Sequence, residues 1–174
     1  GRPAAPVAVL YPTATVWAET VYPEGVWPKP PEHALPPLPA LERLRVHIEA
    51  VASFLVEHQI DFDFIDEQAV IDAEVDEAGL RVGAGCYRAL LLPHTTTVRP
   101  ATLCRLSTFL RAGGQVVALG DLPAHACGPG AAGADIAAAV ARLKREGLLS
   151  AGADWLPLAD ALPRDLRVEP AADL

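Results

Sequence analysis

The chain has 174 residues, of which 51% are hydrophobic and 21% are charged, a composition typical of one globular domain rather than of a disordered segment. Its formal net charge of −8 argues against nucleic acid and anionic membrane as partners, since both attract basic surfaces. No apolar run approaches the length that a membrane-spanning helix needs, so no membrane partner is predicted.

The first predicted element is a buried parallel strand at residues 7–11. Its run of apolar residues is followed by a proline, which is typical of a strand covered on both faces. Residues 12–39 are predicted to form a long loop, because their many prolines block regular structure. The loop carries Trp17, Tyr22 and Trp27, and loops of this length are usually functional or packed against a neighbour.

A long amphipathic helix is predicted next, over residues 39–58. Its apolar residues recur at steps of three and four, which places them on one face of a helix. A second strand follows at residues 62–66, with carboxylates at its end. Residues 73–82 mix acidic and apolar positions around Gly79 and indicate a short hairpin or loop.

The second half of the chain continues the alternation of strands and helices. Aliphatic runs followed by proline or glycine predict its strands, and proline and paired glycines mark the ends of its helices. The predicted elements are a strand at 89–92, a helix from about 100 to 112, a strand at 115–119, a loop at 126–133, a helix at 135–145 and a strand at 166–168.

This alternation predicts an α/β fold in three layers, with a doubly wound and mainly parallel sheet of the flavodoxin-like or class I amidotransferase-like type. We expect the four strands up to residue 119 to lie next to one another in the core. In such sheets, ligands bind beyond the carboxyl ends of the strands. The candidate ligand-facing residues at these ends are Tyr11, Thr13, Asp66, Glu67, His94, Thr95 and Asp121.

A catalytic nucleophile is missing where an amidotransferase-like sheet places one, on a tight turn directly after a central strand. The strand at 115–119 runs into Gly120 and Asp121, with no Cys, Ser or Thr in the turn. Cys127 lies further along the chain and would need a nearby histidine as its base. We therefore predict no catalytic residue, with Cys127 as the alternative nucleophile.

Metal and cofactor sites are not predicted either. The three cysteines lack the spacing of a metal site, and their odd number argues against a disulfide framework. The acidic run of Asp72, Glu74, Asp76 and Glu77 is interpreted as a solvated face, because it lacks the glycine and spacing of a calcium loop. Neither of the glycine-rich segments follows a strand and opens a helix as a phosphate-binding loop would.

Four segments together resemble a known type of domain. They are Val7–Pro12 with Trp17, Asp63–Glu67, Leu91–Pro93 and Gly113–Pro123. They resemble the amidotransferase-like domain that follows the catalytic barrel in large glycoside hydrolases. The similarity is greatest to the alpha-L-rhamnosidase-like proteins of glycoside hydrolase family 106, and more distant to the trimerisation domain of family 42 beta-galactosidases. It covers roughly residues 5–125, and it implies that the acid and base carboxylates lie on a barrel outside this chain.

The leading hypothesis is therefore a non-catalytic structural or assembly domain of a multidomain carbohydrate-active enzyme. The chain has no methionine, begins at Gly1 and stops in a polar stretch, so residues 1–174 are expected to be one domain excised from a larger protein. Its partner would be the neighbouring catalytic domain of the same chain, with a homo-oligomer as a further option. No compartment is predicted.

Two alternatives remain open from the sequence. One is an amidotransferase-like hydrolase that uses Cys127, and the other is a module that binds a small ligand or a sugar. Trp17, Tyr22 and Trp27 suit either a docking surface, predicted to extend from Trp17 to Pro37, or stacking on sugar rings.

Overall fold

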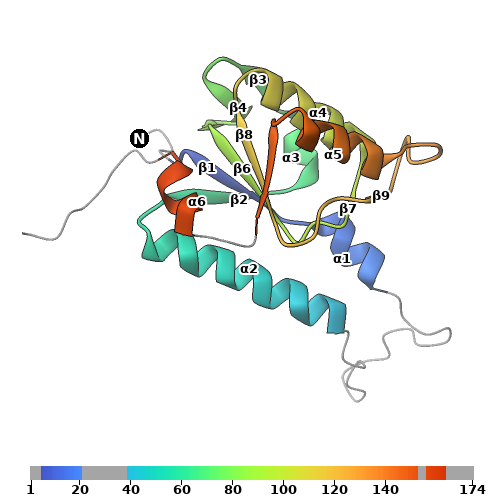
Figure 1. Cartoon of the computed structure of the whole chain (residues 1–174), viewed down its shortest axis with the longest axis horizontal. Helices are drawn as coiled ribbons and strands as arrows, with labels where there is room; N and C mark the ends of the chain where they lie inside the picture. The colour runs from blue at the N-terminus through green and yellow to red at the C-terminus, as the bar shows by residue number, and fades with distance from the viewer. Residues whose placement is uncertain (1–4, 21–38, 153–155, 164–174) are drawn as a thin grey trace, which may run out of the picture.

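The computed structural model describes residues 5–20, 39–152 and 156–163. In this part of the chain a five-stranded sheet lies at the centre and helices cover both of its faces, so the fold is α/β (Figure 1). Neighbouring strands pair in parallel, in the order β10-β8-β6-β1-β2. The strands are β1 (Val7–Leu10), β2 (Phe62–Ile65), β6 (Ala89–Pro93), β8 (Gln115–Leu119) and β10 (Leu149–Gly152).

Two hydrophobic cores lie on opposite faces of this sheet, because successive side chains of a strand point to opposite sides. In β1, Ala8 and Leu10 belong to one core, whereas Val7 and Val9 belong to the other. All four side chains are fully buried. The strand is therefore covered on both faces, as its continuous apolar sequence predicts.

The helices divide between the two faces (Figure 1). α3, α4 and α5 contribute to the core on one face, and α2 and α6 contribute to the core on the other. The short helix α1 follows β1 and contacts α2. The helices are α1 (Thr13–Glu19), α2 (Pro39–Glu57), α3 (Glu67–Asp72), α4 (Pro100–Arg111), α5 (Ile136–Arg145) and α6 (Leu156–Ala161).

Two small sheets complete the described part of the chain. The first is antiparallel and joins β3 (Glu74–Asp76), β4 (Gly79–Val82) and β5 (Gly85–Tyr87) between α3 and β6. The second is a parallel pair, β7 (Thr97–Val98) with β9 (His125–Ala126), which joins the loops that follow β6 and β8.

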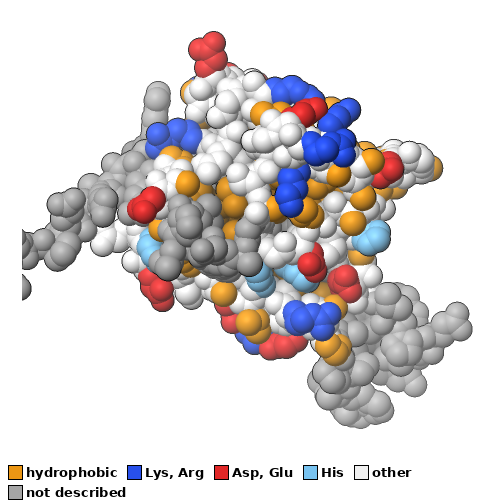
Figure 2. Space-filling model, in the orientation of Figure 1, with side chains coloured by type: hydrophobic (Ala, Val, Ile, Leu, Met, Phe, Trp, Pro, Cys, Tyr) orange, Lys and Arg blue, Asp and Glu red, His pale blue; other side chains and the backbone are white. Residues whose placement is uncertain are grey.

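The ends of the helices have local causes in the sequence. Asp135 accepts a hydrogen bond from the backbone N–H of Ala138 at 2.8 Å and caps the start of α5. The last turn of α5 carries Arg142, Lys144 and Arg145, which suits the partial negative charge at a helix C-terminus. Figure 2 shows basic side chains gathered over this region of α4 and α5.

Most of the predicted elements are confirmed. The four strands up to residue 119 are adjacent in one parallel sheet, and residues 73–82 contain a hairpin formed by β3 and β4. The helix predicted over 39–58 is α2, the helix predicted from about 100 to 112 is α4, and the helix predicted over 135–145 is α5.

The prediction of one continuous loop over residues 12–39 is wrong for its first part, where α1 forms. The prolines that motivated the prediction lie later, and residues 13–19 contain none. The sequence interpretation also missed α3 and β10. The strand predicted at 166–168 lies outside the described residues, as do Tyr22 and Trp27.

Candidate functional site

The carboxyl ends of the central strands meet at one edge of the sheet because the strands are parallel. β1 pairs with β2 on one side and with β6 on the other, so the segments that follow these strands lie close together. Three predicted residues, Thr13, Asp66 and Glu67, line one cavity at this edge. Two others, His94 and Asp121, form a separate pair at the ends of β6 and β8.

The first feature is a cavity of about 550 Å³, within the range of small-molecule sites. We call it the α1–α3 cavity, because α1 and the start of α3 form two of its walls, while Arg99 and the loop after β9 form the others. Besides Thr13, Asp66 and Glu67, its lining includes Trp17, Gln68, Arg99 and Cys127. Three of the seven residues predicted at the strand ends therefore line this cavity.

Glu67 is a buried carboxylate, with only 3% of the residue exposed. Its Oε2 accepts hydrogen bonds from the backbone N–H of Arg99 at 2.9 Å and from Thr102 Oγ1 at 2.7 Å. Both donors belong to the start of α4, where a negative charge is favourable and otherwise free N–H groups need partners. Glu67 therefore ties α3 to the first turn of α4, over a separation of more than 30 residues.

The side chain of Arg99 lies on the cavity wall between polar neighbours. Its Nη1 donates to Gln68 Oε1 at 2.9 Å, and its Nε lies 3.8 Å from Glu67 Oε2. Asp66 accepts a hydrogen bond from the backbone N–H of Ala69 at 2.7 Å and caps α3. Its carboxylate is otherwise exposed and remains able to accept further hydrogen bonds.

Cys127 lines the same cavity, in surroundings that disfavour its thiolate form. Burial, and after it the negative charge of Glu67, raise the pKa of this thiol, whereas Arg99 acts in the opposite direction. No histidine is among the groups that shift the pKa. Because the thiolate is the reactive form, the surroundings of Cys127 do not activate it as a nucleophile.

A single buried hydroxyl holds α1 against the loop that follows β6. Thr15 is fully buried, and its Oγ1 accepts hydrogen bonds from the backbone N–H groups of Thr96 and Thr97, each at 3.1 Å. The same hydroxyl donates to the carbonyl of Thr97 at 3.2 Å. This clamp fixes the helix that carries Trp17, whose side chain lines the cavity although the residue is 76% exposed.

The second feature is a group of three side chains near the end of β8, namely His47, His94 and Asp121. His94 Nδ1 lies 3.4 Å from Asp121 Oδ2, and the rings of His94 and His47 are 6.0 Å apart between centroids. Burial, and then the neighbouring His94, lower the pKa of His47, against the opposing effects of Leu119 and Asp121. His47 is therefore biased towards its neutral form.

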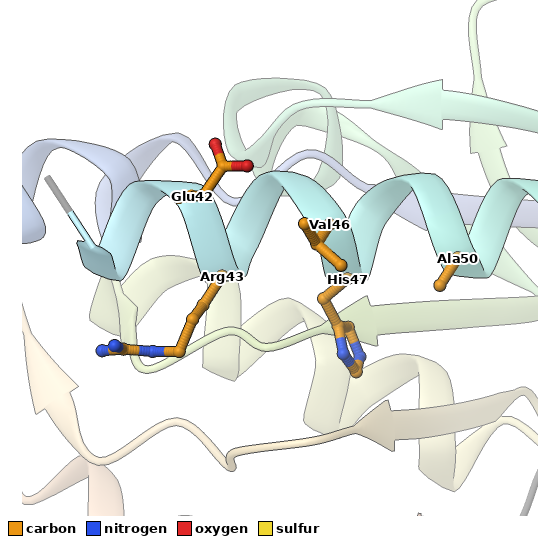
Figure 3. A pocket seen from close by; sticks show the side chains of 5 residues that line it. All are labelled: Glu42, Arg43, Val46, His47 and Ala50. Carbon is orange, nitrogen blue, oxygen red and sulfur yellow. The ribbon is translucent and has the colours of Figure 1, made fainter. Parts of the chain in front are cut away.

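His47 also borders a smaller hollow of about 280 Å³ on α2. In Figure 3, Arg43 and His47 project from the same side of the helix, whereas Glu42 points the other way. The spacing of apolar residues in α2 could have predicted that His47 faces the protein interior. His47 lies three residues after Leu44 and four before Val51, and both of these residues are buried.

Gly120 occupies the turn after β8, in a conformation that disfavours a side chain. Its φ is +85°, a left-handed value that residues other than glycine rarely adopt. A Cβ at this position would also lie 3.3 Å from His47 Cε1 and 3.5 Å from His94 Nδ1.

The remaining predicted residues lie apart from both features. Thr95 is fully buried and its hydroxyl donates to the carbonyl of Pro93 at 3.2 Å, which satisfies it locally. Tyr11 is 47% exposed. The cavity residues Gln68 and Arg99 were not predicted, because no local pattern in the sequence links them.

Within the described ranges, no group of three or more His, Cys, Asp or Glu side chains is arranged to hold a metal ion. Among the helices that the structure describes, none combines the length and apolar character needed to cross a membrane. The chain matches no protein-family model, no curated protein and no solved structure.

Proposed function

We propose that the chain is a non-catalytic accessory domain of a larger carbohydrate-active enzyme, a glycoside hydrolase. The order of the central strands supports the finer fold assignment behind this proposal. Counted along the chain, the five strands stand in the order 2-1-3-4-5, which is the order of flavodoxin-like sheets. An amidotransferase-like domain of the kind that the sequence resembles is expected to share this order.

The turn after β8 is the observation that carries the non-catalytic proposal. Gly120 stands where the resemblance would place a nucleophile, and the turn that it forms with Asp121 contains no Cys, Ser or Thr. Burial and the negative charge of Glu67 raise the pKa of the alternative nucleophile, Cys127, which disfavours its reactive thiolate form. These two features favour an accessory role over an amidotransferase-like hydrolase.

The exposed indole of Trp17 supports a docking role towards the neighbouring catalytic domain. A tryptophan that is 76% exposed leaves a large apolar area in water, and such rings dominate protein interfaces when they are covered. The partner is the catalytic domain of the same protein, and the predicted docking surface from Trp17 to Pro37 begins with this residue.

Turnover assays test the non-catalytic part of the proposal. The purified domain is incubated with aryl glycosides and with glutamine, and no product above the uncatalysed background is expected. Turnover that disappears in Cys127→Ala or Asp66→Ala would overturn the proposal.

A binding assay in trans tests the docking part. The domain is titrated against the remainder of the parent protein, and Trp17→Ala is expected to weaken the association. Val56→Ala is the matched control, because Val56 is also exposed, at 68%, but lies on α2. Equal affinities of the two variants, or a reading frame that encodes no second domain, would contradict the docking role.

A further inference from the structure

The α1–α3 cavity lies where open α/β sheets bind their ligands, beyond the carboxyl ends of the strands. Thr13 follows the end of β1, and Asp66 and Glu67 follow the end of β2. Its volume of about 550 Å³ suits a small molecule. Among the residues that line this space, the accessory role proposed above uses only Trp17.

One wall of the cavity offers a flat apolar surface. Trp17 lines it together with the small residues Ala14 and Ala18 of the same helix. The small neighbours leave the indole accessible to a ring, and the Thr15 clamp fixes the helix in place. An indole on a rigid helix is well suited to stack on the apolar face of a ring-shaped ligand.

The rest of the cavity lining includes hydrogen-bonding groups of both kinds. Asp66 offers carboxylate oxygens, and Arg99 offers the guanidinium N–H groups that Gln68 does not use. Glu67 is already engaged by two donors from α4, so it shapes the wall and contributes charge. A ligand here meets both acceptors and donors within one cavity.

The charges around the cavity disfavour anionic ligands and largely offset one another. Glu67 Oε2 lies 3.8 Å from Arg99 Nε, so these two charges oppose each other's effect on a ligand, and the negative charge of Asp66 is exposed to water and screened by it. A neutral ring whose hydroxyls both donate and accept suits this mixture of groups better than either ion. Sugars combine such hydroxyls with an apolar ring face.

We propose that the α1–α3 cavity is a binding site for a neutral sugar ring, which stacks on Trp17 and hydrogen-bonds to Asp66 and Arg99. The site requires no catalysis by this chain, and it is tested on the isolated domain, where no second domain covers Trp17. Its failure can therefore be distinguished from failure of the accessory role.

Cys127 provides a reporter inside the cavity. The domain is alkylated with iodoacetamide for timed intervals, with and without the methyl glycosides of D-glucose, D-galactose and L-rhamnose, and each thiol is quantified by peptide mass spectrometry. A bound sugar at ten times its Kd is expected to slow the labelling of Cys127 roughly tenfold by mass action. Cys104 on α4 is exposed and lies outside the cavity lining, so its rate is the internal control.

Two variants test whether any protection of Cys127 from alkylation depends on the proposed contacts with the sugar. Trp17→Ala and Arg99→Lys are each expected to abolish most of the protection, whereas Val56→Ala on the distant surface of α2 is expected to preserve it. A sugar-dependent rise in melting temperature, lost in the same two variants, gives a second readout that does not depend on the thiol. Circular dichroism establishes that each variant is folded.

The proposal is overturned if none of the glycosides changes the rate at Cys127 or the melting temperature. It is also overturned if choline or inorganic phosphate protects Cys127 while the glycosides do not, since the site would then select a charged ligand. Protection that persists in a folded Trp17→Ala variant would show that the sugar binds elsewhere.

Discussion

Replacement of Thr15 by valine is expected to destabilise the domain by about 2–4 kcal/mol. Valine has nearly the same shape as threonine, so the change removes the hydroxyl with little change in volume. Three hydrogen bonds disappear with it, two accepted from the N–H groups of Thr96 and Thr97 and one donated to the carbonyl of Thr97.

The magnitude follows from the two backbone donors that lose their partner. The Thr97 N–H lies in a fully buried contact, and an unsatisfied buried donor costs roughly 1–3 kcal/mol. The contact of the Thr96 N–H is only partly buried, so water limits its cost to about 1 kcal/mol. Because small domains are stable by only about 5–15 kcal/mol, this loss is easily measured.

The assay is urea unfolding followed by circular dichroism, with stability extrapolated to water for the wild type and two variants. Thr15→Ser is the matched control, because it keeps the hydroxyl and loses only a methyl group, worth about 0.8 kcal/mol. The valine variant must therefore be the less stable of the two. If Thr15→Ser costs as much as Thr15→Val, packing rather than the hydroxyl holds α1, and the reasoning is refuted.

Three further changes test other parts of the structure. Glu67→Gln should cost about 1–3 kcal/mol in urea unfolding, because an amide replaces the charged acceptor at the start of α4; an unchanged midpoint would contradict the role of the carboxylate. Burial lowers the pKa of His47 in the folded protein below its usual 6.5. The contribution of His47 to stability is therefore complete above pH 6.5, where the ring is neutral, and it is lost as the pH falls from 6.5 through the lower pKa of the folded state. His47→Gln should therefore lose less stability than the wild type between about pH 7.5 and pH 5, and equal losses would rule out this contribution. Burial and the hydrogen bond to Asp63 raise the pKa of Tyr87 to about 12, so stability should fall as the pH rises from about 10 towards that value, and Tyr87→Phe should lessen this fall; identical alkaline profiles would argue against it.

The elements that the sequence predicts well are those whose causes are local. β1, β6 and β8 are continuous apolar runs because both of their faces are buried. The long helix α2 repeats its apolar residues with the period of a helix. Such patterns indicate both the type of an element and which of its residues enter the core.

The elements that the sequence interpretation missed depend on contacts between distant segments. α1 is short and is held by Thr15 against residues more than 80 positions away, a contact that no local pattern reveals. α3 was missed because Asp66 and Glu67 were interpreted as the polar end of a strand, whereas Asp66 caps α3 and Glu67 accepts hydrogen bonds from the start of α4.

The difference between local patterns and contacts of distant segments also applies to the candidate site. The rule that ligands bind at strand ends identified Thr13, Asp66 and Glu67 from the sequence. Arg99 and Cys127 reach the same cavity through the loops after β7 and β9. Their position follows from the pairing of Thr97 and Val98 with residues 125 and 126, which sequence patterns alone do not specify.

The interior position of β1 in the sheet has a consequence for how the protein is made. β1 precedes both of its partners in the chain: β2 pairs with it at Val7↔Phe62, and β6 pairs with it at Val7↔Ala89. The edge of β1 that faces β6 therefore stays unpaired until residue 93 has emerged from the ribosome. A ribosome stalled before β6 would release a fragment with an open aliphatic strand edge, which is prone to aggregate.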